Sequence, residues 1–333
     1  MYYLTYRPQT LSQLDNIEVR EQLAKILASP QIPHAFLFAG PKGTGKTSTA
    51  RILAKELNGP ESAQAIAKGT SPDVIEMDGA SNRKIDDIRA LIAELKFSPL
   101  TSKYKIYIID EVHMLTKEAF NALLKSLEEP PASTIFILAT TEADSLPATI
   151  TSRCMIVTFS QAKNENIISM LKRISTGEKL TFSDDIIQWI ANHADGSFRD
   201  AAKLLETAVV QGITSVDDLQ KITGQTWQKG DLIQLVDAGK KAEALQWIVQ
   251  SAQAGAQFKL LIEDLLSTLH AYLLHKNGIE VPAQYEYTLS IKECAFFMSL
   301  LQKAYGDMKY SPIQSLPLEL AVVEFMETYP RKN

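Results

Sequence analysis

The stretch Gly40-Pro41-Lys42-Gly43-Thr44-Gly45-Lys46-Thr47 decides the fold of this chain, because it matches the pattern G-x-x-x-x-G-K-[ST]. The apolar residues Phe36-Leu37-Phe38 come before it, and helical periodicity runs from Ser48 to Leu57 after it. A glycine-rich turn that arose by chance would not be expected between a strand and a helix. In this setting the backbone N–H groups close around phosphates at the N-terminus of the helix. The stretch therefore predicts a nucleotide-binding site.

Two residues of this phosphate-binding loop carry the charge chemistry. We expect the Lys46 ammonium group to neutralise the β- and γ-phosphates and the Thr47 hydroxyl to ligate Mg²⁺. The residues expected to bind the nucleotide are Gly40, Pro41, Lys42, Gly43, Thr44, Gly45, Lys46, Thr47 and Ser48.

Around the loop, short β-branched and aliphatic runs alternate with helical periodicity from Ala35 to Phe159. This alternation is typical of a parallel sheet covered by helices. It predicts an α/β nucleotide-binding domain with a parallel five-stranded sheet, whose strands are Ala35–Ala39, Asp73–Met77, Lys105–Ile109, Thr134–Ala139 and Met155–Phe159.

Beyond Ser160 the strand pattern stops and helical patterns begin. A small helical lid is predicted from three amphipathic segments, Asn164–Arg173, Ser183–His193 and Ser197–Gln211, which have Ser, Asp or Asn near their starts. A third, all-helical domain is predicted from the segments Asp231–Ala238, Ala242–Ala254, Phe258–Leu274, Ile291–Tyr305 and Pro317–Tyr329. The predicted domains are therefore 1–161, 162–224 and 225–333. The pattern of the last one indicates only a helical bundle without chemistry.

The apolar strand Ile106-Tyr107-Ile108-Ile109 ends in the carboxylates of Asp110 and Glu111. Asp110 is the candidate to hold Mg²⁺ and Glu111 the candidate base for an attacking water, because phosphoryl transfer needs both at the carboxyl edge of a strand. An Asp-Glu pair at a strand end is common and usually only solvated. Because this pair follows a phosphate-binding loop in the same domain, the two together predict hydrolysis of ATP.

Three more side chains are open to two interpretations. Thr141 can reach the γ-phosphate or orient the water, although a threonine at a strand end is more often structural. Arg153 precedes the last predicted strand, and Arg199 opens a predicted lid helix. A lone arginine is usually a surface charge, whereas phosphoryl transfer requires guanidinium groups to neutralise developing charge.

Composition excludes several classes of protein. The 333 residues are enough for two or three domains, and 45% hydrophobic with 22% charged residues is an ordinary globular balance. The start has no signal-peptide pattern and no apolar run reaches membrane-spanning length, so we expect a cytoplasmic protein without a membrane partner. Only Cys154 and Cys294 are present, too few for a disulfide framework. The net charge of −5 leaves binding to DNA through local basic groups open.

Several motifs together resemble the gamma/tau family of bacterial DNA polymerase III clamp-loader subunits, which are AAA+ ATPases. The resemblance is strong from Tyr6 to about Gly224 and diffuse thereafter. Besides the phosphate-binding loop, it rests on Tyr6-Arg7-Pro8-Gln9-Thr10, Asp78-Gly79-Ala80-Ser81-Asn82, Asp110-Glu111-Val112-His113, Phe120-Asn121-Ala122-Leu123-Leu124-Lys125, Leu127-Glu128-Glu129-Pro130-Pro131, Ala139-Thr140-Thr141, Ser152-Arg153-Cys154 and Gly196-Ser197-Phe198-Arg199-Asp200-Ala201.

The resemblance implies roles for single residues. Arg153 would be the arginine finger that acts on ATP in a neighbouring subunit, Arg199 would contact the γ-phosphate of its own subunit, and Thr141 would be the first sensor. The residues implied to lie near the adenine are Tyr6, Arg7 and Pro8. The last domain would be a collar that joins subunits around primed DNA. The implied partners are further copies of this chain, the delta and delta-prime subunits, the sliding clamp and primer–template DNA.

Basic residues near predicted helix starts are candidates for contacts to DNA phosphates. They are Arg83, Lys84 and Lys117. Composition alone favours solvated helix ends, and only the resemblance to the family supports the DNA hypothesis.

The sequence departs from the family pattern in two places. The family usually carries a four-cysteine zinc module after the helix of the phosphate-binding loop, but Asn58-Gly59-Pro60-Glu61 leads through an Ala-rich stretch to Asp73 without a cysteine. We therefore expect no zinc. The chain also ends at Asn333 without the long extension of the tau form, so we expect the behaviour of the short form.

Two other functions remain as alternatives. A branch-migration helicase of the AAA+ class would need a DNA-binding winged domain after the lid, and no basic recognition helix is visible there. A non-hydrolysing scaffold subunit like delta-prime keeps the Ser-Arg-Cys motif but usually lacks a working phosphate-binding loop. The intact Lys46, Thr47, Asp110 and Glu111 argue against the scaffold.

Overall fold

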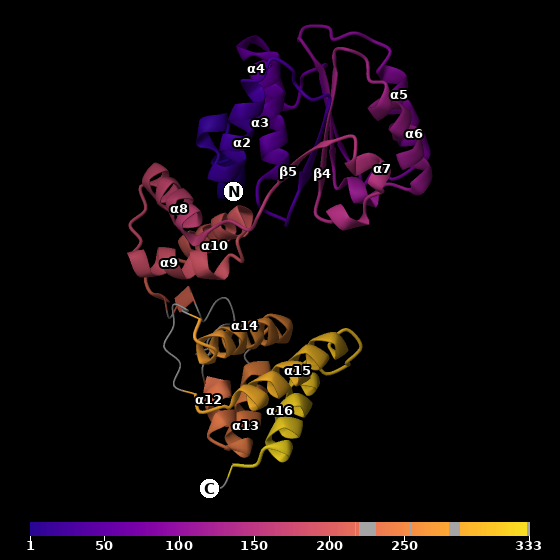
Figure 1. The fold of residues 1–333 in the computed structure, drawn as a ribbon. Coiled ribbons are helices and arrows are strands. Elements are labelled where there is room, and N and C mark those ends of the chain that lie inside the picture. Colours follow the sequence, from indigo (N-terminus) through magenta and orange to yellow (C-terminus); the bar gives the residue numbers. More distant parts are fainter. Residues whose placement is uncertain (217, 220–230, 254, 280–286, 332–333) are drawn as a thin grey trace. The chain divides into compact units, whose positions relative to one another are not determined.

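The computed structural model describes residues 1–216, 218–219, 231–253, 255–279 and 287–331. These form two compact units, Met1–Ile213 and Thr214–Asn333 (Figure 1). The first unit has a hydrophobic core on each face of its sheet, and the second has a core of its own.

The first unit is built on a sheet of five parallel strands in the order β2-β3-β4-β1-β5. The strands are β1 Ala35–Ala39, β2 Val74–Asp78, β3 Lys105–Asp110, β4 Thr134–Thr140 and β5 Met155–Thr158. This confirms the predicted parallel five-stranded sheet. Five strand ends differ by one residue from the prediction, which is the usual uncertainty of an element boundary.

Helices cover both faces of the sheet (Figure 1). One face carries α2 Ile17–Leu27, α3 Lys46–Asn58 and α4 Pro60–Lys68, and the other carries α5 Ile85–Glu94, α6 Lys117–Glu128 and α7 Ala148–Thr151. A short helix, α1 Tyr2–Thr5, opens the chain, and 3₁₀ turns lie at Leu11–Gln13, Val112–Met114 and Ala143–Ser145. The residues of β1 and β4 are all buried, as expected for central strands of a parallel sheet.

Three helices follow the sheet within the first unit: α8 Asn164–Glu178, α9 Asp184–His193 and α10 Phe198–Val210. They are the predicted lid helices, and α8 runs one turn further than predicted before Lys179 adopts a left-handed conformation. Ser197 caps α10, because its Oγ accepts the N–H of Asp200 at 3.1 Å. The boundary at 161 and 162 stays a prediction, and the one at 224 and 225 lies outside the described residues.

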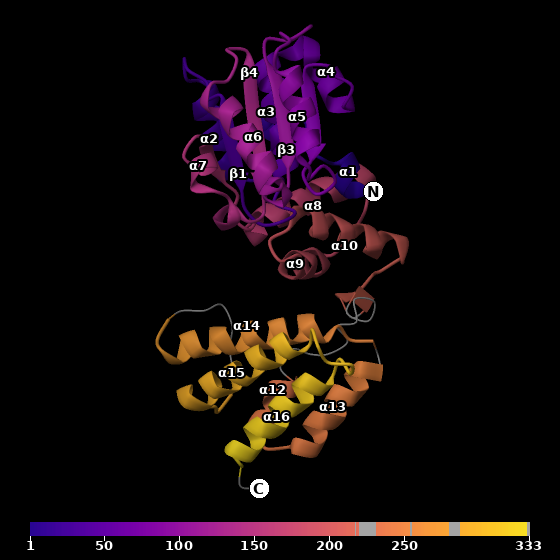
Figure 2. The same cartoon turned by 90° about the vertical axis from the view of Figure 1, so that its right-hand side faces the viewer.

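The described part of the second unit is helical, as predicted (Figure 2). Its helices are α12 Asp231–Asp237, α13 Lys241–Gln253, α14 Phe258–Lys276, α15 Ile291–Asp307 and α16 Leu316–Thr328. Their apolar faces form one core that includes Trp247, Leu269, Phe297 and Phe325. Among the described residues of either unit, no helix has the length and apolar character that crossing a bilayer would require.

The segment after α3, where the family's zinc module would stand, is the helix α4, which the sequence analysis missed. Gly59 has a φ of 79° and lets the chain turn between the two helices, and Pro60 is then favourable in the first turn of α4. Side chains hold the segment in place: Asn58 donates to the carbonyl of Tyr104 at 3.0 Å, and the hydroxyls of Ser62 and Ser102 are 2.9 Å apart.

Purified protein should therefore contain no stoichiometric zinc, and chelators should leave its unfolding temperature unchanged. A structural zinc site needs about four Cys or His ligands, and the described residues contain no group of three or more His, Cys, Asp or Glu placed to hold a metal. Elemental analysis and thermal unfolding with and without EDTA measure both expectations. A zinc content near one atom per chain would contradict them.

Candidate nucleotide-binding site

A cavity of about 1090 Å³, open solvent included, lies at the carboxyl end of the sheet in the first unit. Its walls come from the phosphate-binding loop, from the N-terminal segment and from the lid helices α8 and α10. The carboxyl ends of parallel strands are where ligands bind in open α/β sheets. The cavity is therefore the candidate nucleotide-binding site.

The phosphate-binding loop needs glycine at two positions for different reasons. Gly45 precedes α3 with a φ of 98°, in the left-handed region that favours glycine. Gly43 has a φ of 80°, and a Cβ atom there would lie 1.9 Å from Oγ of Ser197 at the start of α10. The loop and the first residues of a lid helix are thus in direct contact.

Lys46 lies at the start of α3 with only 6% of its surface exposed. Its Nζ donates to the carbonyl oxygens of Gly40 and Pro41 at 2.7 and 2.8 Å, within the same loop. Burial lowers the pKa of Lys46, and the nearby carboxylates of Glu111 and Asp110 oppose this change. The loop thus holds one cation at the point where phosphate charge would be neutralised.

The predicted metal-binding pair is in contact. Thr47 Oγ1 donates to Oδ2 of Asp110 at 2.6 Å, and the other carboxylate oxygen of Asp110 accepts the N–H of Glu111 at 3.0 Å. A hydroxyl and a carboxylate are oxygen ligands of the kind that Mg²⁺ prefers, so these residues fit the ion.

Glu111 turns the chain sharply as it leaves β3. Its φ of 46° is uncommon for a residue with a side chain, and such conformations cluster at functional sites. Gly79 lies against this turn: its N–H donates to the carbonyl of Asp110 at 2.7 Å, and a Cβ on Gly79 would lie 2.7 Å from the carbonyl oxygen of Glu111. The backbone at Glu111 therefore packs directly against Gly79, where even a Cβ atom would be too close.

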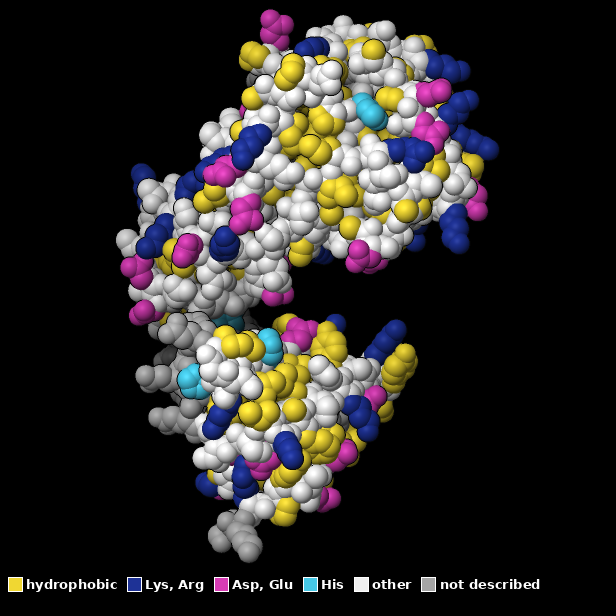
Figure 3. All heavy atoms as spheres, in the orientation of Figure 1, with side chains coloured by type: hydrophobic (Ala, Val, Ile, Leu, Met, Phe, Trp, Pro, Cys, Tyr) yellow, Lys and Arg dark blue, Asp and Glu magenta, His cyan; other side chains and the backbone are white. Residues whose placement is uncertain are grey.

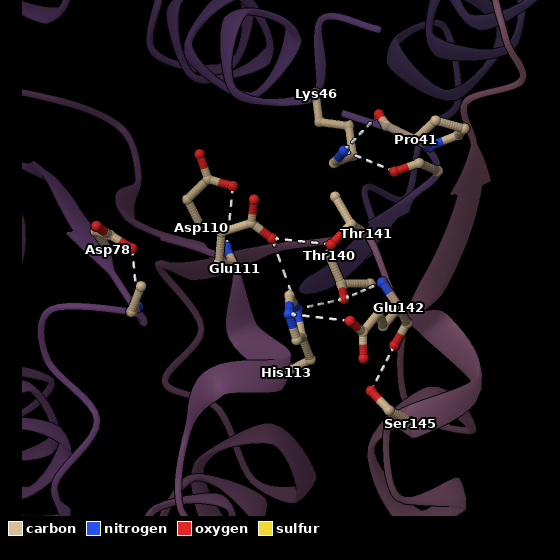
Figure 4. Close-up of polar contacts among 12 residues, drawn as sticks. Pro41, Lys46, Asp78, Asp110, Glu111, His113, Thr140, Thr141, Glu142 and Ser145 are labelled. Carbon is tan, nitrogen blue, oxygen red and sulfur yellow. Dashed lines mark hydrogen bonds and ion pairs between the residues drawn. The ribbon is translucent and has the colours of Figure 1, made fainter. Parts of the chain in front are cut away.

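The Glu111 carboxylate is part of a polar cluster (Figure 4). Its Oε2 accepts the hydroxyl of Thr141 at 3.3 Å and lies 3.6 Å from Nδ1 of His113. The same Nδ1 is 3.0 Å from Oγ1 of Thr140, which accepts the N–H of Glu142 at 2.9 Å. The end of β4 and the end of β3 thus meet at the candidate base.

The N-terminal segment forms another wall of the cavity through Tyr6, Arg7 and Pro8. Arg7 Nε donates to Oγ of Ser48 at 2.6 Å, and burial lowers the pKa of this guanidinium group. Tyr6 donates its hydroxyl proton to Glu178 at 2.8 Å, which raises the pKa of the phenol. The structure therefore brings these residues to the cavity that the phosphate-binding loop also lines, while the predicted contact with adenine stays a prediction.

The two candidate arginines occupy different places. Arg199, in the first turn of α10, lines the cavity, and its positive charge lowers the pKa of both Lys46 and Arg7. Arg153 does not line the cavity: its guanidinium group donates to Glu128 and to the carbonyl of Thr149, both at 2.6 Å.

The predicted DNA-contact residues are exposed and share one edge of the unit. Lys84 and Lys117 stand at the starts of α5 and α6, and the carbonyl of Arg83 accepts the N–H of Thr116 at 3.1 Å, which joins the two starts. Lys and Arg side chains on the visible face of this unit alternate with Asp and Glu and do not form a continuous basic surface (Figure 3). Their contact with DNA stays a prediction.

The sequence analysis missed the parts played by His113, Glu142 and Gly79. His113 belongs to a motif that carried the family resemblance, but nothing in its spacing says that it faces Glu111. For Gly79, the glycine in Asp78-Gly79-Ala80 was a visible signal, although only the fold shows which carbonyl it lies against.

Known proteins resemble this chain in sequence over almost its whole length. The tau subunit of DNA polymerase III from Bacillus subtilis is 35% identical over 98% of this chain, which spans 63% of that relative's length. The gamma subunit of DNA polymerase III from Buchnera aphidicola of Acyrthosiphon pisum is 34% identical, with 89% of this chain and 90% of the relative covered.

Two further comparisons are coarser. A family model described as the delta subunit of DNA polymerase III matches residues 16–163. The solved structure of the Thermotoga maritima RuvB Holliday junction branch migration motor superposes with a TM-score of 0.54 at 19% identity, covering 83% of this chain and 99% of that one. At that identity the likeness shows a shared fold and nothing about the reaction.

Proposed function

Because this chain belongs to the gamma/tau family of DNA polymerase III subunits and has the AAA+ fold, we propose that it hydrolyses ATP as a subunit of a sliding-clamp loader. The observation that carries the proposal is the convergence of Lys46, Thr47, Asp110, Glu111 and Thr141 at one edge of the sheet. These are the side chains that phosphoryl transfer to water requires.

Each of these side chains has a distinct task. Lys46 neutralises charge on the β- and γ-phosphates, and Glu111 accepts a proton from the attacking water while Thr141 holds one oxygen of its carboxylate. Thr47 and Asp110 would hold Mg²⁺, which when bound neutralises phosphate charge and orients the phosphates.

Two arginines, one in the lid and one before β5, would connect the nucleotide to the arrangement of the subunits. Arg199 would contact the γ-phosphate of its own subunit from the cavity wall, whereas Arg153, outside the cavity, would act on ATP bound to a neighbouring copy. A nucleotide held between subunits changes their arrangement only through contacts that differ between the two arrangements, and these arginines supply such contacts. In the proposed cycle, ATP organises the subunits to open the clamp, primed DNA triggers hydrolysis, and the clamp is released closed.

The test is reconstitution of the complex from this chain, its delta and delta-prime partners and the sliding clamp. ATP turnover should rise when primed DNA is added, and the clamp should become linked to circular primed DNA only in the presence of ATP. Turnover that responds to neither clamp nor primed DNA would contradict the proposal. Processive ATP-driven movement of DNA strands would favour the branch-migration alternative instead.

A delta-prime-like scaffold is the second candidate, favoured by the match of residues 16–163 to a delta-subunit family model. The contacts of the phosphate-binding loop argue against it. A scaffold that does not hydrolyse ATP needs neither a buried Lys46 to neutralise phosphate charge nor a contact between Thr47 and Asp110 to hold Mg²⁺. Measurable ATP turnover that Glu111→Gln slows, with ATP still bound, would exclude the scaffold.

A further inference from the structure

His113 is the one member of the Asp110-Glu111-Val112-His113 motif that has a polar side chain and no task in the proposed reaction. It lies in the 3₁₀ turn after β3, and its side chain is only 11% exposed. A nearly buried imidazole requires partners for its ring nitrogens. Its partners are the groups that surround the candidate base.

The Nδ1 atom of His113 faces two oxygens, Oγ1 of Thr140 at 3.0 Å and Oε2 of Glu111 at 3.6 Å. The Thr140 hydroxyl already accepts the N–H of Glu142 at 2.9 Å and keeps a lone pair for a second donor. In the tautomer that carries a proton on Nδ1, this proton lies between a hydroxyl oxygen and a carboxylate oxygen. The other nitrogen, Nε2, is 3.9 Å from the carboxylate of Glu142.

The two oxygens of Glu111 are in different situations. Oε2 is fixed from one side by Thr141 and faces His113 on another. In Figure 4, His113 lies on the side of Glu111 away from Lys46, below the carboxylate, whereas the phosphate-binding loop lies above it. Contacts at one oxygen restrict the rotation of the carboxylate and leave its other oxygen directed toward the phosphate side.

We propose that His113 is a positioning residue for Glu111: a proton on Nδ1 links the base to Thr140 and so fixes the carboxylate to the end of β4. The inference rests on the proposed function, because it assigns Glu111 the task of the base. It deepens that function, since the orientation of the base depends on residues Thr140 to Glu142 as well as on β3. A base that is misplaced by about 1 Å can lose about a hundredfold in rate.

The test compares substitutions of His113 in the reconstituted complex with primed DNA. His113→Ala should lower kcat by about 10- to 100-fold, the range typical for partners that orient a reacting group, and should leave the affinity for ATP nearly unchanged. His113→Phe keeps the volume of the ring without its nitrogens and should be equally slow. His113→Asn can place a donor near the position of Nδ1 and should recover much of the rate.

A control is His34→Ala, which removes the imidazole of an exposed residue of the same unit, whose Nε2 lies 3.1 Å from the carbonyl oxygen of Leu127. This variant should keep the parent kcat. Full activity of His113→Phe would overturn the positioning role alone, as would a loss of ATP affinity and unfolding temperature in proportion to kcat. A parent complex that binds ATP without turning it over would instead overturn the proposed function, and the two failures are thus distinguishable.

Discussion

Replacing Lys46 by Ala is expected to abolish ATP turnover by the reconstituted complex and to leave the fold of the chain intact. The substitution removes the cation that the loop holds beside the phosphates. Loss of one such electrostatic contact typically costs about 10²–10³-fold in rate. The fold should survive because the lost hydrogen bonds, to Gly40 and Pro41, join the lysine only to its own loop.

Steady-state turnover, binding of a fluorescent ATP analogue and thermal unfolding together measure this result. Lys68→Ala, an exposed lysine at the end of α4, is the control for loss of one positive charge and should behave as the parent. Glu111→Gln should differ from both, because it keeps the phosphate contacts and removes the base, so it should bind ATP and hydrolyse it slowly. Parent-like turnover by Lys46→Ala would mean that the loop is not the phosphate site.

Replacing Arg153 by Ala is expected to leave the isolated chain's affinity for ATP nearly unchanged and to collapse DNA-stimulated turnover in the assembled complex. The guanidinium group lies outside the cavity of its own subunit, bonded to Glu128 and Thr149. An arginine supplied from a neighbouring subunit can contribute about 10³-fold or more to phosphoryl transfer. Equilibrium ATP binding to the lone chain and turnover by the complex measure the two halves of the expectation.

Arg199→Ala serves as the contrast, because Arg199 lines the cavity of its own subunit. It should weaken ATP binding already in the isolated chain. Mixing Arg153→Ala chains with Lys46→Ala chains should restore turnover only where an intact Arg153 faces an intact phosphate-binding loop. If the two arginine variants showed equal defects that did not depend on assembly, the division of roles between them would be wrong.

The parts of the site that could be predicted from the sequence are those whose residues are neighbours in the chain. The phosphate-binding loop and the pair Asp110 and Glu111 each combine a short motif with a buried strand, so local pattern was enough to predict them. The sheet followed for the same reason, because its central strands are buried on both faces and read as unbroken apolar runs.

The features that could not be predicted from the sequence depend on contacts between segments that are distant in the chain. Helix α4 was missed because Gly59 and Pro60 signal a break, and only the structure shows that they join two helices. The contact of Arg7 with Ser48 spans 41 positions, and that of His113 with Thr140 spans 27. Spacing in the chain cannot indicate such pairs, because they exist only once the strands have their order in the sheet.

Gly79, whose lack of a side chain leaves room for the carbonyl of Glu111, limits which amino acids this position can accept during evolution. Every missense change at a glycine codon adds at least one carbon, and here that first carbon would lie 2.7 Å from a backbone oxygen. The new Cβ and the carbonyl oxygen of Glu111 are both held by the backbone and cannot move apart as a flexible side chain could. The clash would therefore shift the backbone turn at Glu111, the candidate base. Even the smallest substitution at position 79 is therefore expected to displace the backbone of Glu111, the candidate base.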